Sequence, residues 1–511
     1  MKKILIFILI LPLFAACAKL PDFDRTYTYA LPDTDDTTYK KMFSERQKSH
    51  PNQSAFYLLN NGLDAFVARA IAAQYAEKSL DVQYYIYRKD MVGELITYEV
   101  IRAADRGVRV RLLLDDINMG EWDQDLLELN AHPNIEVRLF NPFNRKTGRL
   151  GQLLTHEHAI TRRMHNKSFT ADNQVTILGG RNIGNEYFYA NPEISFADLD
   201  VMGFGAIAKG VSTSFDRYWN NELSYPIDVL IENKLSKEEA EAAKKEFYAE
   251  MEKYRDSEYD IALLHSTLYE KLKNHDVKLF WGKADVLYDN PNKILSDLSE
   301  TKYNLTPQLK PYLESIQKEL LIFSPYFIPG KSGVAFLTDL VKNGTRVAIL
   351  TNSLASNDVG IVHSGYAKYR KALLAGGVEL YELNKKLMAN EKKKMEKHGS
   401  GSSKASLHAK AFVFDRKNVF IGSLNLDPRS VVHNTEIGVI IKSEEMAKHM
   451  AENFDFGMSK YAFKLELKDN EIFWHGIVNG KEKTFDVDPY TGFWKRFGVK
   501  LMGFLPLEDQ L

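Results

Sequence analysis

The chain has 511 residues, 44% of them hydrophobic and 26% charged, which is typical of globular proteins and long enough for two or more domains. Its formal net charge is −1, so it lacks the overall positive field with which proteins bind nucleic acid without sequence preference, and a non-specific nuclease is disfavoured. The single cysteine, Cys17, excludes an internal disulfide.

Residues 1–16 have the pattern of a secretory signal peptide. Lys2 and Lys3 precede an apolar run over 4–14 that is too short to span a bilayer comfortably. The small residues before Cys17 resemble the bacterial lipoprotein processing site, which implies an acylated cysteine and a lipid-anchored protein on the periplasmic side of the cell envelope. Ala18 resembles the sorting pattern that favours the outer over the inner membrane. The alternative is an uncleaved anchor with a buried cysteine.

Residues 17–53 are polar and contain three prolines, which predicts a lipidated N-terminus followed by a tether. A first folded half is expected over 54–235. Its predicted elements are a helix over 63–76, a strand over 80–87, a helix over 92–106 that ends at Gly107, and strands over 108–114 and 135–140. Strands that alternate with helices predict parallel pairing with right-handed crossovers.

The same order of elements returns later in the chain. Residues 236–304 are expected to form a helical connection, since 236–273 is charged and has a helical pattern. A second half is expected over 305–464, with a strand over 320–323, a helix over 334–342 capped by Gly344, and strands over 346–350 and 378–383. Residues 465–511 are a C-terminal extension. The repeat predicts an α/β fold with two duplicated halves related by a pseudo-twofold axis.

One motif occurs in each half with identical spacing. The two copies are His165-Asn166-Lys167, Asp172 and Gly179-Gly180-Arg181-Asn182, and His408-Ala409-Lys410, Asp415 and Gly422-Ser423-Leu424-Asn425. Each copy predicts a hairpin, with strands over 164–171 and 174–178 in the first half and over 407–414 and 418–422 in the second. Side chains two apart on a strand share a face, so His and Lys point the same way, while each Asp falls in the turn and is expected to be a scaffold residue.

Two such faces brought together would place two imidazoles, two ammonium groups and two carboxamides around one site. The expected catalytic residues are His165, Lys167, Asn182, His408, Lys410 and Asn425. The lysines and asparagines would bind the non-bridging oxygens of a phosphodiester, one histidine would attack phosphorus, and the other would protonate the leaving alkoxide. Because the lysines supply the positive charge, neither a metal ion nor another cofactor is expected. One His-x-Lys pair can arise by chance, but two that agree at every spacing are specific.

These paired motifs resemble those of the phospholipase D superfamily, in which a His-Lys-Asp motif occurs twice per active site. H-N-K-S-F-T-A-D with G-G-R-N-I-G-N-E-Y-F, and L-H-A-K-A-F-V-F-D with I-G-S-L-N-L-D-P-R-S, are similar to the C-type bacterial cardiolipin synthases. The resemblance extends from about residue 54 to the C-terminus. It implies phospholipase D-like α/β/α halves with mixed sheets and an active site at their interface. It also implies a phosphatidyltransferase that makes cardiolipin from phosphatidylglycerol and a second membrane phospholipid, such as phosphatidylethanolamine, through a covalent phosphohistidine.

Two further acids are expected to support the imidazoles. Glu436 follows Asn425 by 11 residues, and in the first half either Asp198 or Asp200 precedes a comparable stretch, with Asp198 favoured by the resemblance. An acid that accepts the distal N–H of an imidazole would fix its tautomer and stabilise the imidazolium. We assign His165 as nucleophile and His408 as general acid and then base, although a symmetric site can run in either direction.

Three segments have two interpretations each. The basic stretch 385–403, rich in glycine and serine, is either a solvated loop or a flap that attracts anionic lipid head groups. Residues 493–505 mix aromatic and basic side chains, as in an interfacial helix or in a C-terminal helix docked on the core. His156 and His158 either contact substrate or serve the local structure.

Two rival functions remain open. A hydrolytic phospholipase D, or a phosphodiesterase or nuclease of the same superfamily, would use the same residues with water as the acceptor. Motif spacing does not decide between water and an alcohol, because acceptor choice depends on the shape of the pocket. A non-catalytic envelope protein on a duplicated scaffold is the second rival, and the intact His, Lys and Asn residues in both halves speak against it.

Overall fold

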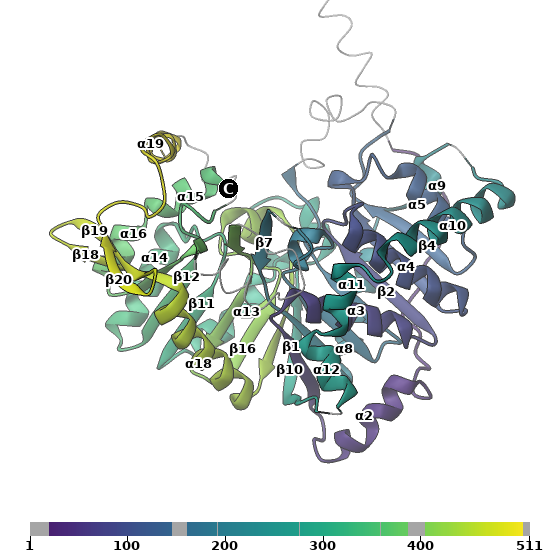
Figure 1. Ribbon diagram of the computed structural model, residues 1–511, viewed down its shortest axis with the longest axis horizontal. Helices are drawn as coiled ribbons and strands as arrows, with labels where there is room; N and C mark the ends of the chain where they lie inside the picture. Colours follow the sequence, from purple (N-terminus) through teal and green to yellow (C-terminus); the bar gives the residue numbers. More distant parts are fainter. Residues whose placement is uncertain are drawn as a thin grey trace, which may run out of the picture.

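The computed structural model describes residues 20–145, 161–191, 193–232, 234–274, 276–357, 359–386 and 404–503. Within these ranges the protein consists of two α/β halves that lie side by side (Figure 1). The duplicated mixed α/β fold predicted from the sequence is confirmed. Cys17, His156, His158 and nearly all of the basic stretch 385–403 lie outside the described residues.

The sheet of the first half is mixed. Its strands lie in the spatial order β1 (Ser54–Leu59), β8 (Asp200–Phe204), β6 (Val175–Gly179), β5 (Ser168–Ala171), β2 (Ser79–Tyr84), β3 (Arg109–Asp115), β4 (Ile135–Phe140) and β9 (Ser224–Pro226). The pairs β2–β3 and β3–β4 are parallel, as the strand–helix–strand pattern predicted, and the other pairs are antiparallel.

The second half repeats this order and these directions. Its strands are β10 (Phe280–Tyr288), β17 (Ile437–Lys442), β16 (Asn418–Gly422), β15 (Ala411–Phe414), β11 (Glu319–Phe323), β12 (Arg346–Thr351), β13 (Glu379–Leu383) and β18 (Ala462–Lys468). Two further antiparallel strands, β19 (Glu471–Val478) and β20 (Lys481–Phe485), extend its outer edge. The internal duplication read from the sequence is therefore also a duplication of sheet topology.

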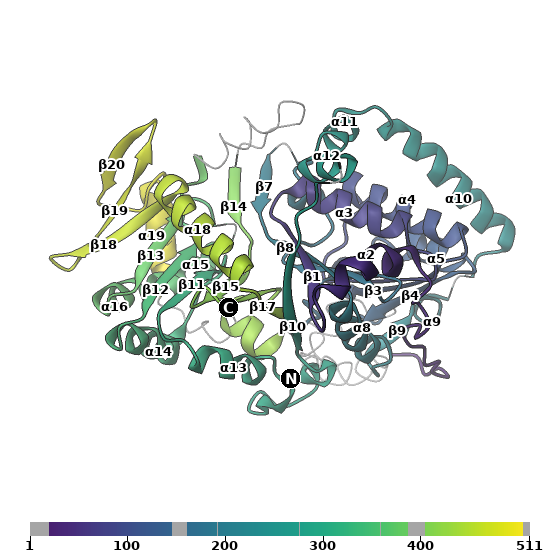
Figure 2. The same cartoon turned by 90° about the horizontal axis from the view of Figure 1, so that it is seen from below.

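Strands β1 and β10 join the two sheets. They occupy equivalent positions in the two halves and pair with each other antiparallel, so the pseudo-twofold axis runs between them (Figure 2). Residues 236–273 are helical as predicted, in α10 (Lys237–Met251), α11 (Glu258–Leu264) and α12 (Thr267–Lys273). Strand β10, however, lies inside the segment 236–304 that was expected to be a helical connection. Exposed Lys283 and Asp285 alternate with Gly282 and Ala284, which are small, so this part of the strand has no strongly apolar face to mark it in the sequence.

Helices pack around the sheets. In the first half these are α3 (Gly62–Gln74), α4 (Met91–Asp105), α5 (Asp123–Asn130), α8 (Ala206–Trp219) and α9 (Ile227–Leu230). In the second half they are α13 (Thr306–Glu314), α14 (Gly330–Lys342), α15 (Gly360–Ala367), α16 (Arg370–Ala375), α18 (Glu444–Tyr461) and α19 (Phe493–Met502). The helices predicted over 63–76, 92–106 and 334–342 are present as α3, α4 and α14. Gly107 and Gly344 follow α4 and α14 with φ of 95° and 88°, the left-handed conformation expected after a helix end.

Apolar side chains from both halves share one core at the interface. Phe56, Leu178 and Val201 of the first half belong to the same buried cluster as Leu407, Val419 and Ile421 of the second. Burial of such side chains contributes about 1.5–3 kcal/mol each, so the halves form one unit rather than two mobile domains. This fixed interface is what holds the two motifs in register.

The N-terminal residues 20–53 differ from the expected tether. Their main chain lies along the first half, where Arg111 and Arg138 donate to the carbonyl oxygens of Thr28 and Thr26 at 2.9 and 3.0 Å. Residues Thr38–Lys48 form helix α2, in which Tyr39 is buried. Polar composition alone suggested a loose arm, but these carbonyls satisfy buried guanidinium groups of the first half.

None of the helices in the described ranges has the length and apolar character needed to cross a bilayer.

Candidate active site

Each His-x-Lys segment leads into a tight hairpin. The turns Asp172-Asn173 and Asp415-Arg416 have φ between 52° and 53° at all four residues, as two-residue type I′ turns require. The first strand of each hairpin is shorter than predicted, because β5 begins at Ser168 and β15 at Ala411. The histidines lie just before them, since the chain there pairs across the interface instead: His165 N–H donates to Thr435 O, and His408 N–H to Ala197 O.

The turn aspartates face away from the histidines and hold the start of a neighbouring strand. Asp172 accepts hydrogen bonds from the main-chain N–H groups of residues 77, 78 and 79, and Asp415 does the same for residues 317, 318 and 319. These N–H groups lie at the beginning of β2 and β11, so each aspartate ties a hairpin to the parallel part of its sheet. The position supports a scaffold role rather than one in the chemistry.

We expect Asp172→Asn to retain more activity than Lys167→Ala while lowering thermal stability. The asparagine keeps one oxygen for the turn but loses the charge that strengthens three hydrogen bonds, at a cost of about 1–3 kcal/mol. Initial rates and thermal unfolding of the two variants measure the contrast. A rate loss equal to that of Lys167→Ala, with the unfolding temperature unchanged, would assign Asp172 to the chemistry instead.

The histidine of each half is paired with an acid of the other half. His165 Nδ1 lies 2.8 Å from Glu436 Oε2, and His408 Nδ1 lies 2.6 Å from Asp198 Oδ2. Both pairs are buried, with the histidines 8% and 7% exposed. A carboxylate on Nδ1 fixes the tautomer that leaves Nε2 for a substrate. Asp200, the other acid considered in the first half, pairs instead with Arg69 at 2.8 Å.

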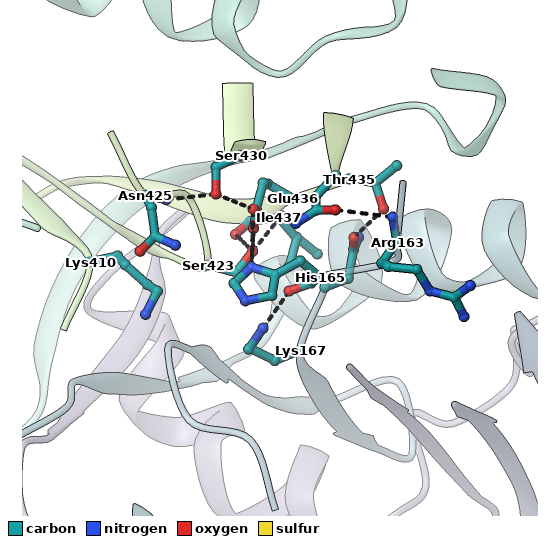
Figure 3. A network of polar contacts seen from close by, with 12 residues as sticks. Arg163, His165, Lys167, Lys410, Ser423, Asn425, Ser430, Thr435, Glu436 and Ile437 are labelled. Carbon is teal, nitrogen blue, oxygen red and sulfur yellow. Dashed lines mark hydrogen bonds and ion pairs between the residues drawn. The ribbon is translucent and has the colours of Figure 1, made fainter. Parts of the chain in front are cut away.

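Glu436 sits in a network of hydroxyl groups (Figure 3). The hydroxyls of Ser423 and Ser430 both donate to its carboxylate, and its main-chain N–H donates to Asp289 at 2.7 Å. Burial raises the pKa of Glu436 to about 7. At Asp198 burial also opposes ionisation, but the charges of His408 and Lys410 outweigh it and the pKa of Asp198 is lowered. The two histidines therefore have electrostatically different partners.

The two lysines are buried beside the histidines. Lys167 Nζ donates to His165 O and Lys410 Nζ donates to His408 O, each at 2.6 Å. Burial lowers the pKa of Lys167 to about 7. The pKa of His165 is lowered well below its usual 6.5, first by burial and then by the charges of both lysines and of His408. Residues of both halves thus act on one another electrostatically, as expected if the two imidazoles and the two lysines share one site.

The asparagines occupy equivalent positions with different surroundings. Asn182 accepts from the main-chain N–H of Ile86 at 3.2 Å and donates to the hydroxyl of Tyr187 at 2.9 Å. Asn425 Oδ1 is buried and has no hydrogen-bond partner within the described chain. Figure 3 shows the Asn425 side chain beside Lys410, to the left of the His165 ring. A buried amide with unused hydrogen-bonding capacity is suited to a polar ligand.

Comparisons with known proteins show the family to which the chain belongs. A family model described as "Cardiolipin synthase, PLD-like domain" matches residues 71–219 and 309–456, each of which contains one motif and one of the two paired acids. The chain belongs to this family. Cardiolipin synthase C of Escherichia coli is 42% identical over 90% of this chain and 96% of its own length. A cardiolipin synthase of Oceanobacillus iheyensis is 22% identical over 80% and 71%.

A solved structure has the same fold as this chain. Phosphatidylserine synthase from Haemophilus influenzae superposes with a TM-score of 0.56 at 15% identity, covering 83% of this chain and 92% of its own. The family relationship and the shared fold together confirm the phospholipase D resemblance that the paired motifs indicated.

Sequence reasoning missed a pair of side chains that position the histidines. Asp115, at the end of β3, accepts from Met164 N–H at 2.8 Å, and Asn352, just after β12, accepts from Leu407 N–H at 2.9 Å. Each fixes the residue directly before a histidine. Both stand at the carboxyl end of a buried parallel strand in equivalent places of the two halves, and that shared position is the signal by which they could have been found.

Proposed function

We propose that the protein is a phosphatidyltransferase that makes cardiolipin from phosphatidylglycerol and a second phospholipid. The observation that carries this proposal is the pair of imidazoles, each oriented by an acid of the opposite half and flanked by buried lysines. Family membership and the 42% identity to cardiolipin synthase C support the choice of reaction.

In the first step the phosphatidyl group is transferred to the enzyme. His165 Nε2 attacks phosphorus, the bond from phosphorus to the leaving alkoxide breaks, and His408 gives its proton to that alkoxide. The ammonium groups of Lys167 and Lys410 and the amides of Asn182 and Asn425 neutralise the charge on the non-bridging oxygens. The products are a phosphohistidine at residue 165 and a free alcohol.

In the second step the same groups act in reverse. The hydroxyl oxygen of the acceptor lipid attacks phosphorus while His408 takes its proton, and the P–N bond to His165 breaks. With phosphatidylglycerol as acceptor the product is cardiolipin, and with water it is phosphatidic acid. The enzyme returns to its starting protonation state, because His408 has lost one proton and regained one.

The electrostatic difference between the two pairs supports the order of attack. A nucleophile must be neutral, and the strongly lowered pKa of His165 keeps it so. A general acid must carry a proton. Burial and the charge of Lys410 lower the pKa of His408 as well, but ionised Asp198 opposes this shift, so the imidazolium of His408 is less disfavoured than that of His165. We therefore assign His165 as nucleophile and His408 as the proton carrier.

Labelled lipid distinguishes transfer from hydrolysis. Purified protein is given labelled phosphatidylglycerol in mixed micelles, with and without phosphatidylethanolamine, and the products are separated. Labelled cardiolipin is the expected product. A higher yield when phosphatidylethanolamine is present would make that lipid the second substrate. Labelled phosphatidic acid alone, in both mixtures, would replace transfer by a hydrolytic phospholipase D.

The lowered pKa of Lys167 predicts an alkaline limit to activity. Substrate binding requires the ammonium form, which is lost as pH rises through about 7. The pH dependence of kcat/KM reports ionisations of the free enzyme, so kcat/KM should fall about tenfold per pH unit above that value. In the complex the bound anion favours the ammonium form, so kcat should decline only at higher pH. The arginine of Lys167→Arg stays charged, so kcat/KM of this variant should not decline in this pH range, even if its rate is lower. The same alkaline decline of kcat/KM in both proteins would assign this decline to another group, such as Glu436.

For location, we propose a lipid anchor in the bacterial envelope, periplasmic and with the outer membrane favoured. Support comes from the signal-like residues before Cys17 and from the lipid substrates that the family implies. We expect Cys17→Ser to abolish incorporation of labelled fatty acid in cells and to shift the protein out of the membrane fraction. Labelling that persists in this variant would remove the acylation proposal.

A further inference from the structure

Helix α19 carries an apolar face that the rest of the described chain does not cover. Phe493, Trp494, Phe497 and Leu501 are 64%, 79%, 51% and 60% exposed. The rings of Phe493, Trp494 and Phe497 contact one another, with centroids 5.4–6.3 Å apart. Exposed aromatic side chains gathered on one short helix are unusual in a soluble surface, where large apolar residues are mostly scattered singly.

The helical register shows that this face points away from the protein. At about 100° per residue, the four exposed residues fall within an arc of about 100°. Val499, the buried residue of α19, lies on the opposite side and faces the body of the protein. Lys500 and then Arg496 follow one edge of the arc, whereas Lys495 lies toward the side of Val499. The ten residues of α19 include three basic side chains and no acid.

Buried ion pairs fix α19 in this orientation. Asp488, five residues before the helix, accepts a hydrogen bond from Arg370 at 2.9 Å, and His363 of α15 lies 3.8 Å from the same carboxylate. Arg496 donates to the carbonyl oxygen of Thr491 and so closes the first turn. The helix itself packs against α15. A segment tied down on one side by buried charges presents its other side as a fixed surface.

Helix α19 is connected through α15 to a strand whose carboxyl end carries a residue of the candidate active site. Helix α15, on which α19 packs, follows β12, and Asn352 after β12 holds Leu407 next to His408. Figure 1 shows α19 above α15 at the top of the second half, whereas α18 lies low on the same half. A surface that met α19 would therefore approach the protein from the side of the paired motifs.

We propose that α19 is a membrane-contact helix that inserts its aromatic face into the surface of an anionic phospholipid bilayer. An interfacial helix needs apolar residues on one face and basic residues beside them, and α19 has its aromatic face with Lys500 and Arg496 along one margin. The occupant is a bilayer rather than a second copy of the chain, because two faces with basic margins and no acids would repel each other. The inference rests on the proposed function in one respect: the substrates of the site are themselves bilayer lipids.

Tryptophan emission tests the contact directly. Trp494 is the one exposed tryptophan among the five, all of which are described. Vesicles of brominated phosphatidylglycerol should quench part of the emission of the full-length protein, and Trp494→Tyr should lose that part. For a matched control, Phe456→Trp is combined with Trp494→Tyr. Phe456 is 62% exposed on α18, and its replacement should not be quenched.

Equal quenching in the parent and in Trp494→Tyr would overturn the proposal, as would equal quenching at position 456. A change in Trp494 emission with protein concentration and without vesicles would show that α19 binds another copy instead. None of these readings requires turnover, so they remain decisive even if the labelled-lipid assay shows no transfer of phosphatidyl groups.

A kinetic test connects the helix to the site. Phe493→Ser with Phe497→Ser should raise KM for phosphatidylglycerol in vesicles at least about tenfold and leave kcat in detergent micelles unchanged, because micelles deliver lipid without a bilayer surface. Phe456→Ser should change neither value. An equal loss in vesicles and micelles would show that the double variant damages the fold or the site, and would contradict a membrane role for α19.

Discussion

Replacement of either motif histidine by alanine is expected to lower kcat at least about 1,000-fold, the largest effect of any single substitution in the protein. Each imidazole has a separate duty: one forms the bond to phosphorus, and the other moves the proton that the leaving group and then the acceptor require. Among the described residues, the groups bonded to the histidines are two lysines, which the substrate anion requires as cations, and two acids already bonded to Nδ1, so none of these four takes over the duty of a missing imidazole. Rates of both variants are measured with labelled phosphatidylglycerol.

A substrate with an activated leaving group separates the two duties. Phosphatidyl-p-nitrophenol loses a stable phenolate, so departure no longer needs a proton. In His408→Ala the first step should recover, release one equivalent of p-nitrophenol, and stop, because no base activates the acceptor and the phosphohistidine accumulates. In His165→Ala no burst should occur. A burst in His165→Ala and none in His408→Ala would reverse the assignment, and an unchanged rate in either variant would remove the two-histidine mechanism.

The sequence predicted the repeated architecture well because the strand–helix–strand order along each half corresponds directly to its parallel strand pairs. The strand over 135–140 was placed without error, and the helices before Gly107 and Gly344 within a few residues. Strand β10 was missed, since the residues that alternate with its exposed Lys283 and Asp285 include small Gly282 and Ala284 and give little apolar signal. The hairpin strands were drawn too long, because the residues around His165 and His408 pair with the opposite half, a contact that local periodicity does not encode.

The same limit applies to the site. Identical spacing in the two halves identified which residue types converge, and Glu436 and Asp198 were both named. Spacing did not reveal that each acid crosses to the histidine of the other half, because that depends on how the halves dock. Nor did it separate Asp198 from Asp200, which lie two apart. The structure separates them by partner: Asp200 lies against Arg69 and Arg181, and Asp198 against His408.

Crossed pairing leads to the second large effect: an acid of one half should control the chemistry of the histidine in the other. In Asp198→Asn and Glu436→Gln the new amide can donate to Nδ1 and impose the wrong tautomer, which should cost about 100- to 10,000-fold in kcat. Asp198→Asn should resemble His408→Ala and regain a burst with phosphatidyl-p-nitrophenol. Glu436→Gln should resemble His165→Ala and show none.

Asp200→Asn is the matched control for this experiment, because Asp200 is equally buried but bonded to arginines. Breaking that buried pair should destabilise the fold by about 3–5 kcal/mol. The folded fraction should nevertheless show the same dependence on the leaving group as the parent enzyme. If Asp198→Asn suppressed the burst and Glu436→Gln retained it, each acid would serve the histidine of its own half, and the docking of the halves seen here would not be that of the working enzyme. Crossed behaviour would instead explain why the chain holds its halves together with a shared apolar core, since neither half alone contains a complete histidine–acid pair.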